Sequence, residues 1–146
     1  MSIQIDDYTV DRKLGAGGLA DVFAARDPDG RWVAIKLLRE TGRGGAHVRR
    51  FLREGHLLQR FEHPALPKCF AVVEGERPYI VLELMVGQTL SECIRSEGPL
   101  KPEDVIFVAT SVLRALDFLH AHGVVHRDVK SGNIFMKDDG RVMLMD

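Results

Sequence analysis

The sequence predicts an α+β fold, with strands dominating the first half of the chain and helices the second. Three observations predict it. Apolar and polar side chains alternate from Tyr8 to Leu14, as in a half-buried strand. Residues 79–82 form a short apolar run typical of a buried strand, and apolar residues recur at helical spacing between Pro102 and Gly123.

Composition limits the classes of protein to consider. The chain has 146 residues, of which 45% are hydrophobic and 28% charged, enough for one core or two small lobes. The formal charge is −1, so the chain has no overall positive field that would attract nucleic acid or an anionic membrane. Residues 1–7 lack a basic region followed by an apolar run, and no later segment is long and apolar enough to span a bilayer. We therefore expect a cytoplasmic protein without a membrane segment, and we expect Cys69 and Cys93 to be buried free thiols.

The first part of the chain reads as strand, glycine-rich loop, strand, turn and strand. The loop starts at Gly15, the second strand covers Val22–Ala25, the turn covers Asp27–Gly30 and the third strand covers Trp32–Leu38. A dinucleotide fingerprint would open a helix, whereas this loop opens a strand, and the chain has no Gly-Lys-Ser or Gly-Lys-Thr. The pattern predicts a glycine-rich hairpin whose backbone N–H groups lie over phosphates.

A helix is predicted next, because apolar residues recur at helical spacing from Val48 to Phe61, before Pro64. Glu54 lies on its apolar side, where a carboxylate is costly to bury unless a cation meets it. Lys36 is the expected partner. A pair with Arg50 or Arg53 in the same helix is the alternative.

The remaining elements follow from the same rules. Strands are predicted at about 68–73 and 79–83, and a helix starts near Thr89. Pro102 suits the first turn of the long helix and Gly123 its end. A last strand at 141–145 leads to Asp146.

The stretch from His126 to Phe135 has the composition of a catalytic loop. Asp128 can accept a proton from a hydroxyl group, and Lys130 can stabilise a transferring phosphoryl group. Asn133 and Asp146 offer oxygen ligands suited to Mg²⁺.

Three motifs together resemble those of protein kinases. His126, Arg127, Asp128 and Asn133 match H-R-D-L-x-x-x-N with Val129 in place of Leu, and residues 33–36 match V-A-I-K without change. Gly15, Gly17 and Val22 match G-x-G-x-x-G-x-V, with Ala20 replacing the third glycine. The resemblance runs from about Tyr8 to Asp146. Lys130 resembles the serine/threonine type, and the form of the glycine loop resembles bacterial members.

The resemblance implies ATP and Mg²⁺ as cofactors and a protein substrate. It implies that Lys36, Glu54, Asp128 and Lys130 are catalytic and that Asn133 and Asp146 bind the metal. The nucleotide-binding residues that it implies are Leu14, Gly15, Ala16, Gly17, Gly18, Val22, Ala34, Lys36, Leu82, Glu83, Met85 and Phe135.

The resemblance also implies the organisation of the chain as a partial kinase domain over residues 1–146. Residues 8–83 would form an N-lobe with an antiparallel five-stranded sheet and one helix, 84–88 the hinge, and 89–146 the first part of a helical C-lobe. Kinases continue beyond the Asp of Asp-Phe-Gly, so we expect a catalytic domain truncated at Asp146. We also expect weak or absent activity on protein substrates, and self-association through an uncovered C-lobe surface.

Two further functions stay open from the sequence alone. The chain could be a non-catalytic nucleotide-binding fragment or a regulatory, pseudokinase-like module, because either would retain the same motifs. A small-molecule kinase of the aminoglycoside phosphotransferase type shares the implied fold.

Overall fold

The computed structural model describes residues 3–40 and 44–145. They belong to two compact units. The first consists of Met1–Phe61 and Lys68–Leu84, and the second of Glu62–Pro67 and Met85–Asp146.

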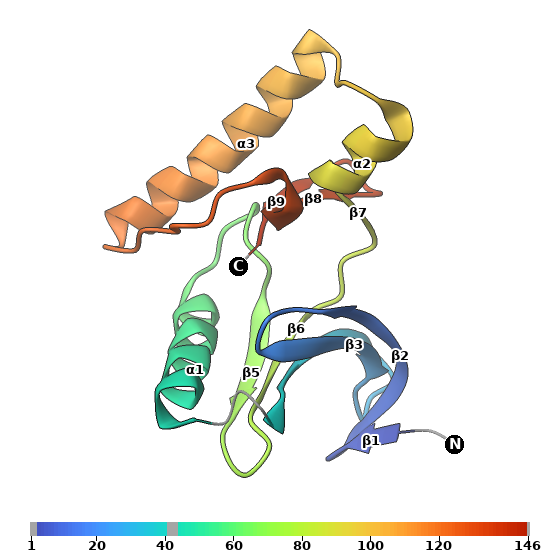
Figure 1. The fold of residues 1–146 in the computed structure, drawn as a ribbon, viewed down its shortest axis with the longest axis vertical. Helices are drawn as coiled ribbons and strands as arrows, with labels where there is room; N and C mark the ends of the chain where they lie inside the picture. The colour runs from blue at the N-terminus through green and yellow to red at the C-terminus, as the bar shows by residue number, and fades with distance from the viewer. Residues whose placement is uncertain (1–2, 41–43, 146) are drawn as a thin grey trace. The chain divides into compact units, whose positions relative to one another are not determined.

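The first unit is built on a six-stranded antiparallel sheet (Figure 1). Its strands lie in the order β1-β2-β3-β4-β6-β5, so β4 has β3 on one side and β6 on the other. The strands are β1 Ile3–Ile5, β2 Tyr8–Ala16, β3 Ala20–Arg26, β4 Trp32–Leu38, β5 Cys69–Val73 and β6 Tyr79–Glu83. Strands β2 to β6 are the five that the sequence predicts, and the α+β fold class is confirmed.

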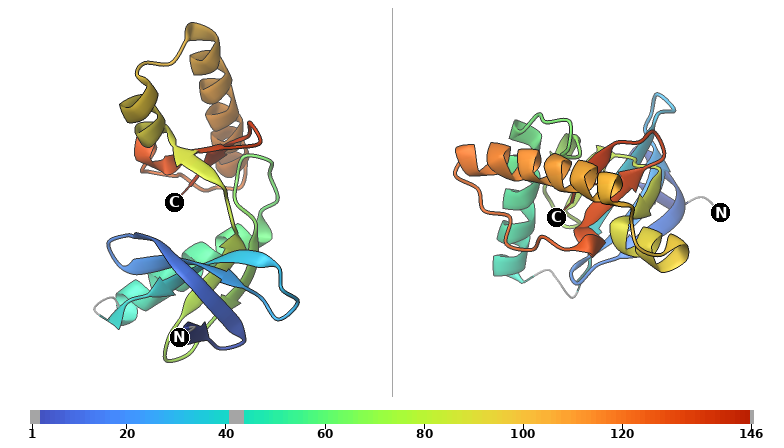
Figure 2. Two further views of the ribbon diagram at one scale, coloured as in Figure 1. Left: turned by 90° about the vertical axis from the view of Figure 1, so that its right-hand side faces the viewer. Right: turned by 90° about the horizontal axis from the view of Figure 1, so that it is seen from above.

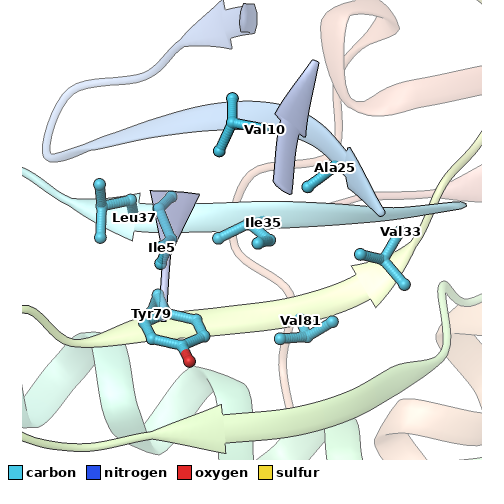
Figure 3. Close-up of a cluster of buried hydrophobic side chains, with 8 residues drawn as sticks. All are labelled: Ile5, Val10, Ala25, Val33, Ile35, Leu37, Tyr79 and Val81. Atoms are coloured by element: carbon cyan, nitrogen blue, oxygen red, sulfur yellow. The ribbon is translucent and has the colours of Figure 1, made fainter. Parts of the chain in front are cut away.

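The side chains of β4 alternate between the two faces of the sheet, as predicted. Val33, Ile35 and Leu37 lie in one buried cluster with residues from β1, β2, β3 and β6 (Figure 3). Ala34 and Lys36 therefore point to the opposite face. There, Leu38 and Ile80 form a second cluster with Phe51 of the helix α1, Gly45–Arg60.

Helix α1 lies close to the sheet because Gly55 faces it. A Cβ atom at position 55 would lie 2.8 Å from Ile80 Cδ1, 2.9 Å from Ile80 Cγ1 and 3.0 Å from Val72 Cγ2. Glycine costs about 1 kcal/mol relative to alanine in a helix interior. Here it allows the helix backbone to approach β5 and β6, and this approach fixes the position of the neighbouring Glu54.

The sequence did not predict the edge strand β1, because three residues are too few for a periodic signal. Tertiary contacts form it. Ile5 is buried, and the turn residue Asp6 accepts a 2.7 Å hydrogen bond from the hydroxyl of Tyr79, 73 positions later. Burial and this carboxylate raise the pKa of Tyr79, which keeps the phenol protonated as the donor.

The second unit contains a three-stranded antiparallel sheet and two helices (Figure 2). The sheet order is β7-β8-β9. The elements are β7 Gly87–Thr89, α2 Leu90–Glu97, α3 Pro102–Ala121, the 3₁₀ turn η2 Ser131–Asn133, β8 Ile134–Lys137 and β9 Val142–Leu144. Helix α2 begins with a capping box between Thr89 and Glu92, and α3 begins with Pro102 in its first turn, as predicted.

A second close approach occurs where β7 meets β8. Gly87 has a φ of 151°, and a Cβ atom at this position would overlap the carbonyl oxygen of Met136. Backbone conformation and space therefore both require glycine.

The two cysteines are free, as predicted, but only Cys93 is buried. Cys69 is half-buried at the start of edge strand β5, so the prediction of a fully buried thiol is wrong for this residue. Its partial burial still raises the pKa of the Cys69 thiol.

We expect Gly55→Ala to destabilise the protein. The added methyl group must push α1 away from Ile80 and Val72, and overpacking of this kind costs about 1–3 kcal/mol. Chemical denaturation measures the change. Gly45→Ala is the control, because a Cβ there meets only the flexible end of Arg49, at 3.3 Å. Equal stability of the two variants would contradict a tight helix–sheet contact at Gly55.

Candidate active site

In the first unit, the sheet register places Lys36 next to the glycine-rich loop. The sheet register pairs Gly15 with Val22, and Val22 with Lys36. Residues directly opposite each other on antiparallel strands share a face. The Lys36 side chain therefore emerges beside Val22, at the base of the loop between β2 and β3.

Lys36 forms an ion pair with Glu54 of helix α1. Nζ donates to Glu54 Oε1 at 2.9 Å, and the two side chains are 18% and 38% exposed. The structure thus selects Lys36 as the partner of Glu54 over Arg50 and Arg53, which are exposed on the same helix. Because Lys36 is largely withdrawn from water, the Glu54 carboxylate offsets part of the cost of burying its ammonium group.

The loop glycines are not required by the fold. Neither Gly15, Gly17 nor Gly18 has a positive φ. A Cβ atom would meet nothing within 4 Å at Gly15 or Gly18, and only the carbonyl oxygen of Ala20, at 3.5 Å, at Gly17. The described part of the chain therefore gives no steric reason for glycine here. Missing side chains leave the loop backbone accessible, which is what binding of phosphate oxygens needs.

The residues that the resemblance implies around an adenine ring come from both units. Ala34 is buried and lies opposite Leu82 in the register, and Glu83 ends β6. The N–H of Glu83 donates to the carbonyl oxygen of Lys68 at 2.9 Å, so this N–H is already used within the fold. Leu14 and Ala16 are exposed on β2. Met85 and Phe135, in the second unit, are both half-buried.

In the second unit, Asn133 organises the predicted catalytic loop. It is a buried polar residue, 8% exposed, whose Nδ2 donates to the carbonyl oxygen of Asp128 at 2.9 Å and to Asp128 Oδ2 at 3.0 Å. These bonds use both hydrogens of the amide and orient its Oδ1. Among the described residues, Oδ1 has no hydrogen-bond donor, so this oxygen can serve as a cation ligand.

His126 supports the same loop from the other side. Its Nδ1 accepts a 3.1 Å hydrogen bond from the N–H of Asp128, so the ring proton lies on Nε2. Nε2 donates to the carbonyl oxygen of Met145 at 2.7 Å. Between them, Arg127 has a positive φ of 69°, which is strained for a residue with a side chain. The sequence placed His126 in the motif without revealing this bracing role.

Asp128 and Lys130 project from the loop toward solvent. Their side chains are 57% and 61% exposed, with Lys130 Nζ 3.4 Å from Asp128 Oδ2. An exposed pair of this kind contributes little stability, and both groups stay accessible to a reactant. The second predicted metal ligand, Asp146, lies outside the described residues. Its neighbour Met145 donates its N–H to the carbonyl oxygen of Asn133 at 2.7 Å.

Comparison with known proteins agrees with these motifs. Residues 8–146 match the family model described as protein kinase domain. The chain belongs to the protein kinase domain family. The resemblance seen in the sequence is thereby confirmed. The family match covers elements of both units.

Curated relatives of this kinase-family chain include serine/threonine-protein kinase PknB from Mycolicibacterium smegmatis, 36% identical over 97% of the chain, and PknB from Mycobacterium tuberculosis, 37% identical over 97%. A probable serine/threonine-protein kinase PknB from Lactococcus lactis is 34% identical over 97%. The chain spans 24%, 24% and 23% of the lengths of these relatives. Within the described ranges, no helix has the length and apolar character of a membrane span.

We expect Asn133→Ala to destabilise the second unit by about 1–3 kcal/mol, because it removes two hydrogen bonds that a buried side chain makes to Asp128. Lys130→Ala should change stability by no more than about 0.5 kcal/mol, because its ion pair is exposed. Thermal denaturation of both variants measures the difference. Similar stabilities would show that Asn133 does not hold the loop.

Proposed function

We propose that this chain carries the ATP-binding and catalytic-loop residues of a serine/threonine protein kinase, which transfers the γ-phosphoryl group of ATP to a hydroxyl group of a protein. The observation that carries the proposal is the Lys36–Glu54 ion pair at the base of an open glycine-rich loop. Membership of the kinase family and relatives named serine/threonine-protein kinases support it.

The first unit handles the nucleotide in this proposal. Backbone N–H groups between Gly15 and Val22 bind phosphate oxygens. Lys36, held by Glu54, neutralises part of the phosphate charge and orients it. Ala34 and Leu82 supply an apolar contact for the base, together with the residues proposed above at Leu14, Ala16, Glu83, Met85 and Phe135.

The second unit handles the acceptor. Asp128, exposed and oriented by the Asn133 amide, positions the hydroxyl group and accepts its proton. Lys130 stabilises charge on the transferring group. Phosphoryl transfer depends on the position and charge of the groups around the reactants more than on covalent chemistry. A carboxylate that a short hydrogen bond orients, as Asn133 orients Asp128, meets this need.

A divalent cation fits the donor set of this loop. The Asn133 amide presents an oxygen without a hydrogen-bond donor in the described part of the chain, and oxygen donors are those that Mg²⁺ prefers. We propose that Asn133 and Asp146 hold Mg²⁺. When bound, the ion neutralises phosphate charge.

We expect Mg²⁺-dependent ATP binding by this chain in calorimetry, with Lys36→Met raising the Kd at least about tenfold, because a cation beside the phosphates is lost. Asp146→Asn should weaken the dependence on Mg²⁺. Lys101→Met, at the N-cap of α3, is the matched control and should not change the Kd. Absence of ATP binding by the unmodified chain would refute the proposal.

Catalysis is tested separately from binding. We expect Asp128→Asn to retain ATP binding and to abolish transfer of labelled phosphate to a serine-containing peptide, because the variant cannot accept the hydroxyl proton. ATP binding without transfer by the unmodified chain would support a non-catalytic nucleotide-binding module instead.

We also propose that the second unit self-associates through an apolar groove on helix α3. The groove is lined only by apolar residues, among them Ile94, Val105, Leu113 and Val129, which are 41%, 49%, 63% and 47% exposed. An exposed apolar surface of this kind favours contact with a matching surface, and a second copy presents the same one.

Light scattering tests the self-association. The unmodified chain should show a mass above that of the monomer, and Leu113→Glu should lower it by placing a carboxylate in the groove. Val86→Glu is the control, because Val86 is also exposed, at 60%, but does not line the groove. A monomeric unmodified chain would overturn this part of the proposal.

A further inference from the structure

The glycine-rich loop is attached to the end of strand β4 by backbone bonds. The N–H of Arg39, the residue directly after β4, donates to the carbonyl oxygen of Leu19 at 2.9 Å. Within the loop, the N–H of Gly17 donates to the carbonyl oxygen of Ala20 at 2.8 Å. The Leu19 side chain also packs against the cluster that contains Leu38. The second half of the loop is therefore held to the end of β4, whereas the glycines in its first half leave the backbone accessible.

Three charged side chains reinforce this anchor. Arg39 Nε and Nη2 lie 2.9 and 2.8 Å from Asp21 Oδ1, and Lys13 Nζ lies 3.1 Å from the same oxygen. Lys13 is on β2 before the loop, Asp21 is on β3 after it, and Arg39 follows β4. We call Lys13, Asp21 and Arg39 the loop latch, because together they join both sides of the loop to the strand that carries Lys36.

The charge state of the latch suits this role. The Asp21 side chain is 21% exposed. The hydrogen bond from Arg39, followed by that from Lys13, holds the pKa of Asp21 below its ordinary value, so the carboxylate stays ionised at neutral pH. An isolated exposed ion pair contributes little, but here two cations share one carboxylate and a backbone hydrogen bond adds to them.

The latch lies on the face of the sheet opposite to Lys36. Asp21 pairs in the register with Leu37, whereas Val22 pairs with Lys36. Because side chains alternate along a strand, Asp21 and Lys36 point to opposite faces. Asp21 is thus a positioning residue, which acts on the nucleotide only through the loop backbone.

We infer that the loop latch holds the glycine-rich loop in its phosphate-binding conformation and so sets the affinity of the chain for the phosphate groups of a nucleotide. The inference rests on the proposed function. Its physical basis is preorganisation, since a loop ordered before binding loses less conformational freedom when the ligand arrives. Binding of the adenine and ribose groups should not depend on the loop latch.

The test compares ATP with adenosine, which lacks phosphates, in calorimetry on the 146-residue chain. We expect Asp21→Ala to raise the Kd for ATP about fivefold and to leave that for adenosine within about a factor of two. Arg39→Ala should weaken ATP binding less, because Lys13 still binds Asp21, and the double variant should be no worse than Asp21→Ala, because Asp21→Ala alone already removes the bonds from Arg39. Hydrogen exchange of the Gly17 and Arg39 amides should become faster in Asp21→Ala without ligand.

Asp27→Ala is the matched control. Asp27 is also a carboxylate with a lowered pKa, accepts a 3.1 Å bond from Arg31 Nε, and lies beyond the opposite end of β3. This variant should leave the Kd for ATP unchanged, even if the chain loses some stability.

Three outcomes would overturn the inference. Asp21→Ala could bind ATP as the unmodified chain does, it could weaken ATP and adenosine equally, or it could leave the two amides exchanging at the original rate. In each, the unmodified chain still binds ATP, so the proposed function survives. If the unmodified chain binds no ATP, the proposed function fails and the inference about affinity fails with it.

Discussion

The close approach of helix α1 to strands β5 and β6 at Gly55 is the constraint on which the first unit depends. Ile80 and Val72 occupy the space that a Cβ atom would need, so the helix backbone lies against the sheet. Glu54 precedes this contact in the chain and Lys36 lies on the neighbouring strand, in register with Ile80. The 2.9 Å ion pair is therefore a result of backbone packing as well as of electrostatic attraction.

In the second unit, hydrogen bonds rather than a close helix–sheet contact hold the candidate catalytic residues in place. Its predicted catalytic loop is held by hydrogen bonds between the side chains of Asn133 and His126 and backbone groups: Asn133 Nδ2 and His126 Nε2 donate, and His126 Nδ1 accepts. These bonds leave the carboxylate of Asp128 exposed while fixing the chain on both sides of it. The left-handed conformation of Arg127 persists because the surrounding bonds determine it. Rigidity and accessibility are thus combined in one segment.

Sequence patterns predicted most of the elements because residues 8–14 alternate, residues 79–82 form an apolar run between turns, and α3 carries standard end signals. The bounds of β4 and β6 agree with the prediction, whereas β2 extends to Ala16 and β3 starts at Ala20. Strands β2 and β3 extend into the glycine-rich loop because their residues pair with each other there. Such pairing depends on the partner strand, and the propensity of single residues does not predict it. Motif spacing identified Lys36, Asp128 and Asn133 as candidates, and Glu54 followed from its place on the apolar side of a predicted helix.

What the sequence could not predict are contacts between residues far apart in the chain that belong to no motif. Neither Asp21 nor Arg39 stands out locally, and their interaction exists only once β3 and β4 are paired. By contrast, the sequence did predict Lys36 as the partner of Glu54, and the position of α1 confirms it over Arg50. Local sequence patterns specify helices and strands, whereas the distance between two side chains on different elements depends on how those elements pack.

The contact between Asp6 and Tyr79 has a consequence for synthesis on the ribosome. The chain emerges from its N-terminus, so β1 and its turn appear long before β6 exists. The hydroxyl group that holds Asp6 arrives 73 residues later, which is several seconds at about 5–20 residues per second. Until then, Ile5 has no finished core to enter. Strand β1 and its turn are therefore synthesised before β6 but are among the last parts of this unit to reach their native contacts.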